Sequence, residues 1–335
     1  MIRLDASTVL LQWATGGLAF LWVTTRHRQV GIGYGWLLRG TYLLLALGGL
    51  VVGLGVHPVV GRELGLGGVA LAAGAALISS VVRRKAGVSG QIAEHDRRTA
   101  QVAAMTGITR QRDGAVATEE GVSAAPAGLT ERSETERDGA VATERGIGRG
   151  LTERSETERD GAVATERGIG REFNPNLDLV APVIGVLGLI AAGAAAGGNP
   201  ALAIARTLVG AAFLGAVSDA MLLGHWYLVQ PGLPRRHIVE LVKWLAWVWP
   251  VEVGLFLVPT GMISVFNGTI DDGWKGMLGW MWIACAVLTI GLCAVTKSAL
   301  KEKEYSAVMA ATGLLYLAIL TAFGTDLVAR AVLQG

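Results

Sequence analysis

Residues 177–229 read LDLVAPVIGVLGLIAAGAAAGGNPALAIARTLVGAAFLGAVSDAMLLGHWYLV, and they decide the fold class of the chain. Two long apolar runs, about 177–197 and 199–229, are separated in this stretch by a short polar turn. An α-helix needs about 20 predominantly apolar residues to cross the hydrocarbon core of a bilayer. Both runs are long enough, so the sequence predicts two consecutive transmembrane helices.

Asn199 and Pro200 predict where the second of these helices begins, since asparagine is a favoured N-cap and proline a favoured first helical residue. The helix runs to Val229 and is ended by Pro231 and Pro234. At the standard rise it is about 44 Å long. It is longer than the hydrocarbon core, and we expect it to tilt or to project from the membrane.

Six further apolar runs extend the pattern along the chain, at about 7–25, 35–56, 64–82, 237–259, 276–296 and 306–332. The run at 64–82 is rich in glycine and is the weakest of them. A hydrophobic fraction of 52% and a mean hydropathy of +0.47 exclude an ordinary soluble domain. The sequence therefore predicts an all-α integral membrane protein, a bundle of about eight transmembrane helices.

Basic residues gather in alternate loops and predict the orientation. They follow the first, third, fifth and seventh runs, as Arg26 and Arg28, Arg83 to Lys85, Arg235 and Arg236, and Lys297, Lys301 and Lys303. All four loops fall on one side of the membrane only if the helices number eight. Because basic loops stay in the cytoplasm, we expect a multi-pass protein of the cell (plasma) membrane with both termini on the non-cytoplasmic side.

The composition divides the chain into three parts: a three-span segment (1–82), a polar loop (83–174) and a five-span segment (175–335). The loop contains a perfect tandem repeat of the sequence GLTERSETERDGAVATERGIGR, at 128–149 and again at 150–171. Its residues are mainly Glu, Arg, Thr, Gly and Ser, with only scattered apolar ones. Such a segment cannot bury a hydrophobic core, so we expect a long disordered cytoplasmic loop of low complexity.

The densest group of chemically capable residues lies where the fifth predicted helix ends and the sixth begins. His225, Trp226 and Tyr227 end one helix, and Glu240 and Lys243 lie at the start of the next. The short connection makes the two helices antiparallel neighbours, so these five residues share one depth. They form a candidate pocket for a quinone, a lipid headgroup or a haem edge. Alternatively, Glu240 and Lys243 only neutralise each other, and the aromatic residues anchor the hairpin at the membrane interface.

Placing an ionisable side chain in the hydrocarbon core of a membrane costs free energy, so ionisable residues within apolar runs are often functional. Asp219 and Glu252 are such residues, and they form a candidate intramembrane proton or ion site. The alternative is that their polar groups hold helices together. Asp326 and Arg330 are spaced as an i, i+4 pair that we interpret as structural. Arg39 lies near the start of its helix, and we expect it to reach back to the headgroups.

No cofactor is indicated clearly. A haem held by two histidines is a further option for the candidate pocket. Of the histidines, only His225 lies within a predicted helix. His27 and His237, in loops on the same side of the membrane, are the ones that would have to approach it. No Cys/His spacing typical of a metal site is present. Cys285 and Cys293 lie eight residues apart in one run, about 12 Å along a helix, which is too far for a disulfide.

These observations favour an integral membrane protein that is not an enzyme by itself. The leading hypothesis is an accessory subunit of a membrane redox or energy-conversion complex, with its site on the fifth and sixth helices. The first alternative is a small-solute or proton-coupled transporter, although three spans before the loop and five after it do not suggest an inverted repeat. The second is a structural membrane subunit. The expected partners are the lipid bilayer and other membrane subunits; a net charge of +2 gives no reason to expect nucleic acid.

Overall fold

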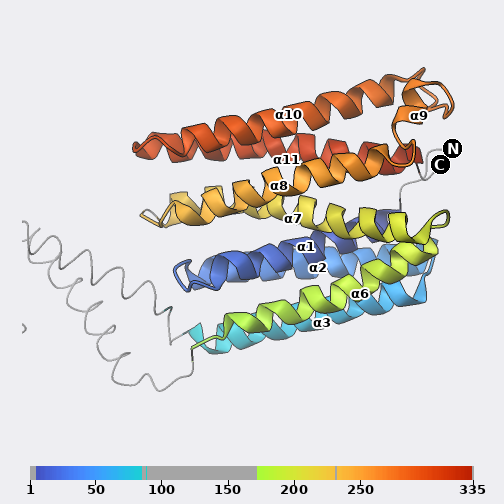
Figure 1. The fold of residues 1–335 in the computed structure, drawn as a ribbon. Coiled ribbons are helices and arrows are strands. Elements are labelled where there is room, and N and C mark those ends of the chain that lie inside the picture. Colours follow the sequence, from blue (N-terminus) through green and yellow to red (C-terminus); the bar gives the residue numbers. More distant parts are fainter. Residues whose placement is uncertain (1–4, 85–87, 89–171, 231, 334–335) are drawn as a thin grey trace, which may run out of the picture. The chain divides into compact units, whose positions relative to one another are not determined.

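The computed structural model of the chain describes residues 5–84, 88, 172–230 and 232–333. Every regular element among these residues is a helix (Figure 1), which confirms the predicted all-α class. The tandem repeat at 128–149 and 150–171, and nearly all of the loop predicted for 83–174, lie outside the described residues.

The helices follow the predicted runs closely. Before the loop lie α1 (Ala6–Thr25), α2 (Ile32–Val56) and α3 (Val60–Val82). After it come the short 3₁₀ helix η2 (Pro175–Leu179), α6 (Val180–Ala195), α7 (Pro200–Val229), α8 (Arg236–Leu257), the short α9 (Ile263–Phe266), α10 (Met277–Ala299) and α11 (Tyr305–Leu333). Asn199 caps α7 as predicted, because its side-chain oxygen accepts the backbone N–H groups of Ala201 and Leu202.

Within the described residues, seven helices are long and apolar enough to cross a membrane, counting η2 and α6 together. The helix α8 is not among the seven, although its 22 residues give it sufficient length. Glu240, Lys243 and Glu252 lower its mean hydropathy, and it packs between helices that do qualify. The chain is therefore a multi-pass helical membrane protein, and the described part agrees with about eight crossings.

Successive long helices run in opposite directions (Figure 1). The connections after α1, α3, α7 and α10 lie at one end of the bundle, and those after α2, α6 and α8 lie at the other. The first end carries the basic residues of all the described basic loops, including Arg26, Arg83, Arg235 and Lys301. The alternation of basic and non-basic loops therefore coincides with the two ends of the bundle.

The long helices pack as two groups of four. In the first group α1, α2, α3 and α6 contact one another in that order, and α6 returns to α1. In the second group α7, α8, α10 and α11 do the same, and α11 returns to α7. The groups meet where α7 packs on α1 and α6. Although α6 follows the loop in sequence, it belongs in space with the three helices that precede the loop.

Two glycines set the contact between the groups. A Cβ atom added to Gly16 of α1 would lie 1.7 Å from the backbone oxygen of Ala211, and one added to Gly215 of α7 would lie 2.2 Å from the backbone carbon of Gly16. No larger residue fits at either position. Small residues of this kind let membrane helices pack backbone to backbone, so α1 and α7 form the closely packed centre of the bundle.

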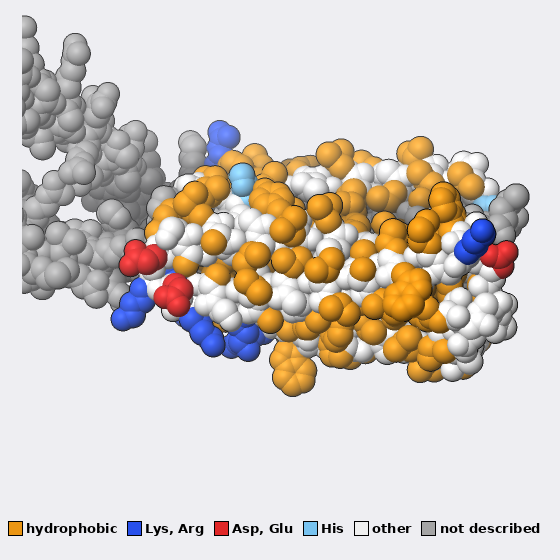
Figure 2. Space-filling model, turned by 90° about the horizontal axis from the view of Figure 1, so that it is seen from above, with side chains coloured by type: hydrophobic (Ala, Val, Ile, Leu, Met, Phe, Trp, Pro, Cys, Tyr) orange, Lys and Arg blue, Asp and Glu red, His pale blue; other side chains and the backbone are white. Residues whose placement is uncertain are grey.

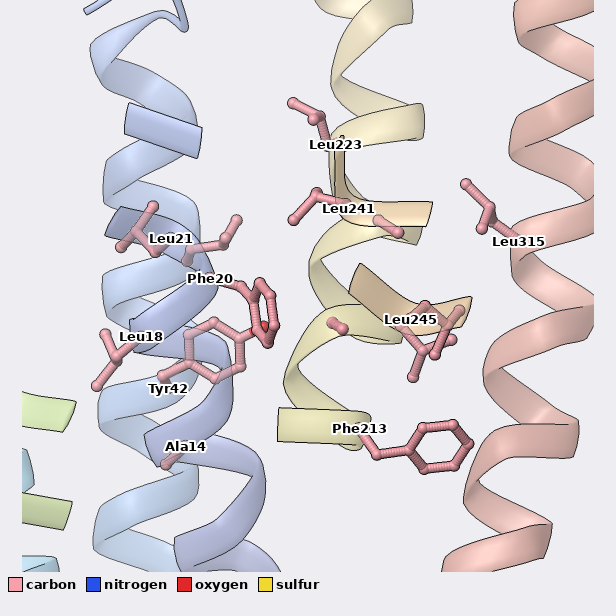
Figure 3. Close-up of a cluster of buried hydrophobic side chains, with 14 of the residues drawn as sticks. Ala14, Leu18, Phe20, Leu21, Tyr42, Phe213, Leu223, Leu241, Leu245 and Leu315 are labelled. Atoms are coloured by element: carbon pink, nitrogen blue, oxygen red, sulfur yellow. The ribbon is translucent and has the colours of Figure 1, made fainter. Parts of the chain in front are cut away.

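Apolar side chains fill the space around these two helices. Figure 3 shows this core, in which Leu18, Leu21 and Tyr42 of the first group lie on one side and Phe213, Leu223, Leu241, Leu245 and Leu315 of the second group on the other. The outer surface is also apolar, with Leu71, Trp247 and Trp280 each at least two-thirds exposed. In the view of Figure 2, hydrophobic side chains cover the surface between the ends, and charged ones gather at the two ends. This is the surface expected of a bundle in lipid.

Candidate functional site

The five residues of the predicted pocket point in different directions. His225 is exposed, and its Nδ1 atom lies 3.4 Å from the Tyr316 hydroxyl of α11. Trp226 packs on Tyr34 with ring centroids 5.9 Å apart. Tyr227 is buried and donates to the backbone oxygen of Pro234 at 2.7 Å, which ties the end of α7 to the turn before α8. The roles visible for Trp226 and Tyr227 are therefore structural.

Glu240 and Lys243 do not pair with each other. Glu240 instead forms an ion pair with Arg26, in the connection after α1, and both side chains are about one-third exposed. Lys243 is exposed on the outer face of α8. Neither of the two cavities described below is lined by any of the five predicted pocket residues. The neutralising pair expected within the hairpin is thus replaced by a pair between α8 and the first group.

Asp219, the first candidate for an intramembrane proton or ion site, is fully buried where α7 meets the first group. The Tyr42 hydroxyl of α2 donates to its Oδ1 atom, while no group that the structure describes donates to its Oδ2 atom. The neighbouring Ser218 accepts a hydrogen bond from the Trp13 indole at 2.8 Å. A polar cluster from α1, α2 and α7 therefore lies inside the apolar interface, and one carboxyl oxygen in it remains free to bind a proton or another donor.

Glu252, the second candidate, is also fully buried, and the Asp326 carboxyl lies close enough for the two side chains to share a hydrogen bond when one of them is protonated. No other described side chain or backbone group donates to its carboxyl oxygens. The charged groups that act on it are Asp326 and Arg330 of α11 and Arg206 of α7. Arg330 donates through Nε to both oxygens of Asp326, at 2.8 and 2.9 Å, which confirms the predicted i, i+4 pair. Glu252 itself forms no ion pair within the described part of the chain. A buried carboxyl without a pairing cation is costly when it is ionised, so Glu252 is a candidate for a neutral, proton-binding group.

A glycine makes room for this cluster. A Cβ atom on Gly210 of α7 would lie 2.4 Å from an Nη atom of Arg330, 2.5 Å from the Nε2 atom of Gln12 and 2.9 Å from an oxygen of Asp326. Gln12 donates to the backbone oxygen of Thr207 at 2.9 Å. The cluster thus connects α1 and α7 with α8 and α11, and it spans both four-helix groups.

A cavity of about 320 Å³ lies next to the cluster, at the end of the bundle opposite the basic loops. It is lined by the 196–199 turn and by residues of α7, α8 and α11, namely Ala196, Gly197, Gly198, Asn199, Leu202, Ala203, Arg206, Thr207, Phe256, Arg330 and Leu333. Arg206 and Arg330 are the charged residues of this lining, and no acidic side chain belongs to it. The guanidinium carbon of each lies 5.6 Å from the centroid of the Phe256 ring, so the two cations flank one aromatic residue.

A smaller cavity, of about 40 Å³, lies at the opposite end beside Arg39. Here the structure corrects an expectation, because Arg39 does not reach back to the headgroups. Its Nε and Nη2 atoms donate to the two oxygens of Asp178, each at 2.7 Å, and both side chains are buried. The guanidinium also lies over the Phe173 ring. Asp178 lies in η2, 139 residues after Arg39 in the chain, so only the folded structure brings the two side chains together.

The histidines do not come together as a haem site would require. His27 and His237 pack against each other, with ring centroids 5.8 Å apart, whereas the partner described for His225 is Tyr316. Partial burial and the nearby Arg26 lower the pKa of His27. Among the residues that the structure describes, no group of three His, Cys, Asp or Glu side chains is placed to hold a metal ion.

Sequence reasoning missed two members of the Glu252 cluster, Arg206 and Gln12. Both are polar residues within long apolar runs, which is the signal that could have drawn attention to them. Tyr42, the partner of Asp219, carries no such signal, since tyrosine is common in membrane helices.

Comparisons with models of known protein families, with curated proteins and with solved structures found no match.

Proposed function

We propose that the protein is a membrane carrier that couples the movement of a small solute to the movement of protons. The observation that carries this proposal is Glu252, a fully buried carboxyl that forms no ion pair among the described residues and lies beside a second buried carboxyl, Asp326, in the cluster that adjoins a cavity at one end of the bundle. In a membrane an unpaired ionisable residue is a functional candidate by default. Coupling of proton movement to solute movement requires at least a group that binds and releases a proton and an adjacent space that admits the solute.

Asp219 supplies a second proton-binding group in this proposal. It lies between the two four-helix groups, whereas Glu252 lies within the second group. Carriers commonly alternate their access by rocking one bundle of helices against another around a fixed site. The contact of α1 with α7, where the backbones approach closely at Gly16 and Gly215, joins the two groups and would serve as the pivot. Rocking there changes the surroundings of Asp219 and opens or closes the Glu252 cluster.

The test is proton flux in proteoliposomes that contain the purified full-length chain and a pH-sensitive dye. Pools of small carboxylates, amino acids, sugars and amines are added in turn, and a solute-dependent change of internal pH identifies the solute class. Glu252→Gln and Asp219→Asn are expected to abolish proton flux. Glu302→Gln, at an exposed carboxyl in the connection before α11, is the matched control and should transport normally. Flux that is insensitive to both buried substitutions would contradict the proposal.

One observation favours a second function, the accessory subunit of a membrane redox complex. His225 and Tyr316 form an exposed pair on the outer face of α7 and α11, where a quinone headgroup dissolved in the membrane could accept hydrogen bonds. Absorption spectra and solvent extracts of the purified protein test this hypothesis. A haem band or a co-purified quinone that is lost in His225→Ala would favour it. Absence of both, together with absence of proton flux, would leave a structural membrane subunit.

A further inference from the structure

The charge balance around the large cavity points to the chemistry of its ligand. Among the described residues that line it there are two guanidinium groups and no carboxylate. Arg330 is paired with Asp326, but Arg206 forms no ion pair with any carboxylate that the structure describes. Arg206 instead donates to the backbone oxygens of Leu255 at 3.0 Å and Val258 at 2.7 Å. These bonds fix the position of its guanidinium without neutralising it.

The positive charge is held where a ligand can reach it. Arg330 is buried, and its side chain donates to the backbone oxygen of Arg206 at 2.7 Å, which fixes the Arg330 guanidinium against α7. Asp326 neutralises only one of the two guanidinium groups, so a further anion beside them would offset the remaining positive charge. A site of a few hundred Å³ with a small number of fixed polar groups is typical for a small molecule. Planar guanidinium groups match the two oxygens of a carboxylate or the oxygens of another oxyanion.

We propose that this cavity binds a small solute through its oxyanion, with Arg206 and Arg330 as the recognising groups. The inference rests on the proposed carrier function, since it names the class of solute that the carrier would move. The remaining lining is small or apolar, with Ala203, Leu202 and Phe256 among its members. It therefore favours a short organic anion over a large polyvalent one.

Glu252 then couples the proton to the anion. With Glu252 protonated, two guanidinium groups face the single charge of Asp326, and the cluster keeps one net positive charge. When Glu252 releases its proton, that positive charge is cancelled and the anion loses its electrostatic partner. By linkage, proton and anion each strengthen the binding of the other. The groups that face Glu252 are Arg206 from α7 and Asp326 and Arg330 from α11. The titratable groups of α10 are the thiols of Cys285 and Cys293 and, in its last turn, Lys297.

The test is a binding measurement that needs no transport. Calorimetry with the detergent-purified full chain uses butyrate as the probe, and inorganic sulfate as an oxyanion without a carboxyl group. Binding is expected to weaken once the pH is high enough for Glu252 to lose its proton, because the net positive charge of the cluster is then cancelled while a carboxylate probe stays ionised. Glu252→Gln, which is always neutral, should bind the probe with no such pH dependence.

Two pairs of variants test the site itself. Arg206→Gln should weaken binding at least tenfold, whereas Arg236→Gln, at an exposed arginine at the other end of α8, should not. Because loss of Arg206 also removes hydrogen bonds to the end of α8, a second variant keeps both arginines. Ala203→Met fills the cavity and should abolish binding, and Ala201→Met, on the exposed side of the same turn, should leave it unchanged.

The outcomes separate this inference from the carrier proposal. Binding with these sensitivities but without proton flux would support the anion site and reject the carrier. Proton-coupled transport of an uncharged solute would support the carrier and overturn the anion site. Absence of binding of both probes, or binding unaffected by Arg206→Gln and Ala203→Met, would also overturn it. Loss of probe binding in nanodiscs of phosphatidylglycerol, but not of zwitterionic phosphatidylcholine, would assign the cavity to the headgroup of an anionic lipid and reject a soluble anion.

Discussion

The buried ion pair of Arg39 and Asp178 should be one of the most sensitive points in the fold. Its side chains are only 3% and 1% exposed, and two parallel hydrogen bonds of 2.7 Å join them. Replacing Asp178 by leucine leaves the Arg39 guanidinium buried and without its partner. Removing one member of a buried pair typically costs about 3–5 kcal/mol. We expect a loss of this size in the free energy of unfolding.

The matched control is the exposed pair of Arg26 and Glu240, whose side chains are 35% and 29% exposed. Solvent screens such a pair, so Glu240→Gln should cost less than about 1 kcal/mol. The double variant Arg39→Met with Asp178→Leu removes both charges together. It should recover most of the loss, because a buried pair pays a desolvation penalty that apolar residues of similar volume do not.

The assay is unfolding of the purified protein in mixed micelles with increasing dodecyl sulfate, followed by tryptophan fluorescence and by circular dichroism. The reasoning would be refuted if Asp178→Leu cost no more than Glu240→Gln. It would also be refuted if the double variant were as unstable as the single one, because the loss would then come from packing around η2 and not from the unpaired charge.

Three further outcomes are expected. In a variant without native cysteines, a cysteine at the exposed Ala196 should react with an impermeant thiol reagent outside intact cells and one at Glu302 should not; the opposite labelling would reverse the orientation. Desolvation by itself would raise the pKa of the Asp272 carboxyl. Three backbone N–H groups at and just before the start of α10 donate to this carboxylate, and they lower its pKa overall. Its stabilising effect is therefore fully present above the unfolded pKa of about 3.9 and is lost as the pH falls through the lower folded value, so Asp272→Asn should flatten the acid limb of a stability profile. Gly215→Val should separate α1 from α7 and reduce the yield of folded protein, while Gly254→Ala, which meets no atom within 4 Å, should be neutral in the same expression assay.

The sequence was sufficient to predict the helices of this protein, because the length and hydropathy of each segment decide whether that segment crosses the membrane, independently of the other segments. Length and hydropathy predicted each long helix to within a few residues, and Asn199 with Pro200 predicted the start of α7. The alternation of basic loops predicted that the chain crosses the bilayer an even number of times, and the helix directions agree. The i, i+4 spacing predicted the Asp326 and Arg330 pair, since that contact needs no other helix.

The tertiary structure alone decided which residues meet across helices. Sequence gives the depth of His225, Glu240 and Lys243, but not the rotation of their helices, and the three face different surroundings. Rotation is set by close packing at glycines such as Gly16 and Gly215, whose partners lie about 200 residues apart in the chain. For the same reason the grouping of α6 with α1 to α3 is invisible in a chain that reads as three spans and five. The cavity and its arginines follow from that packing, because a space between helices belongs to no single helix.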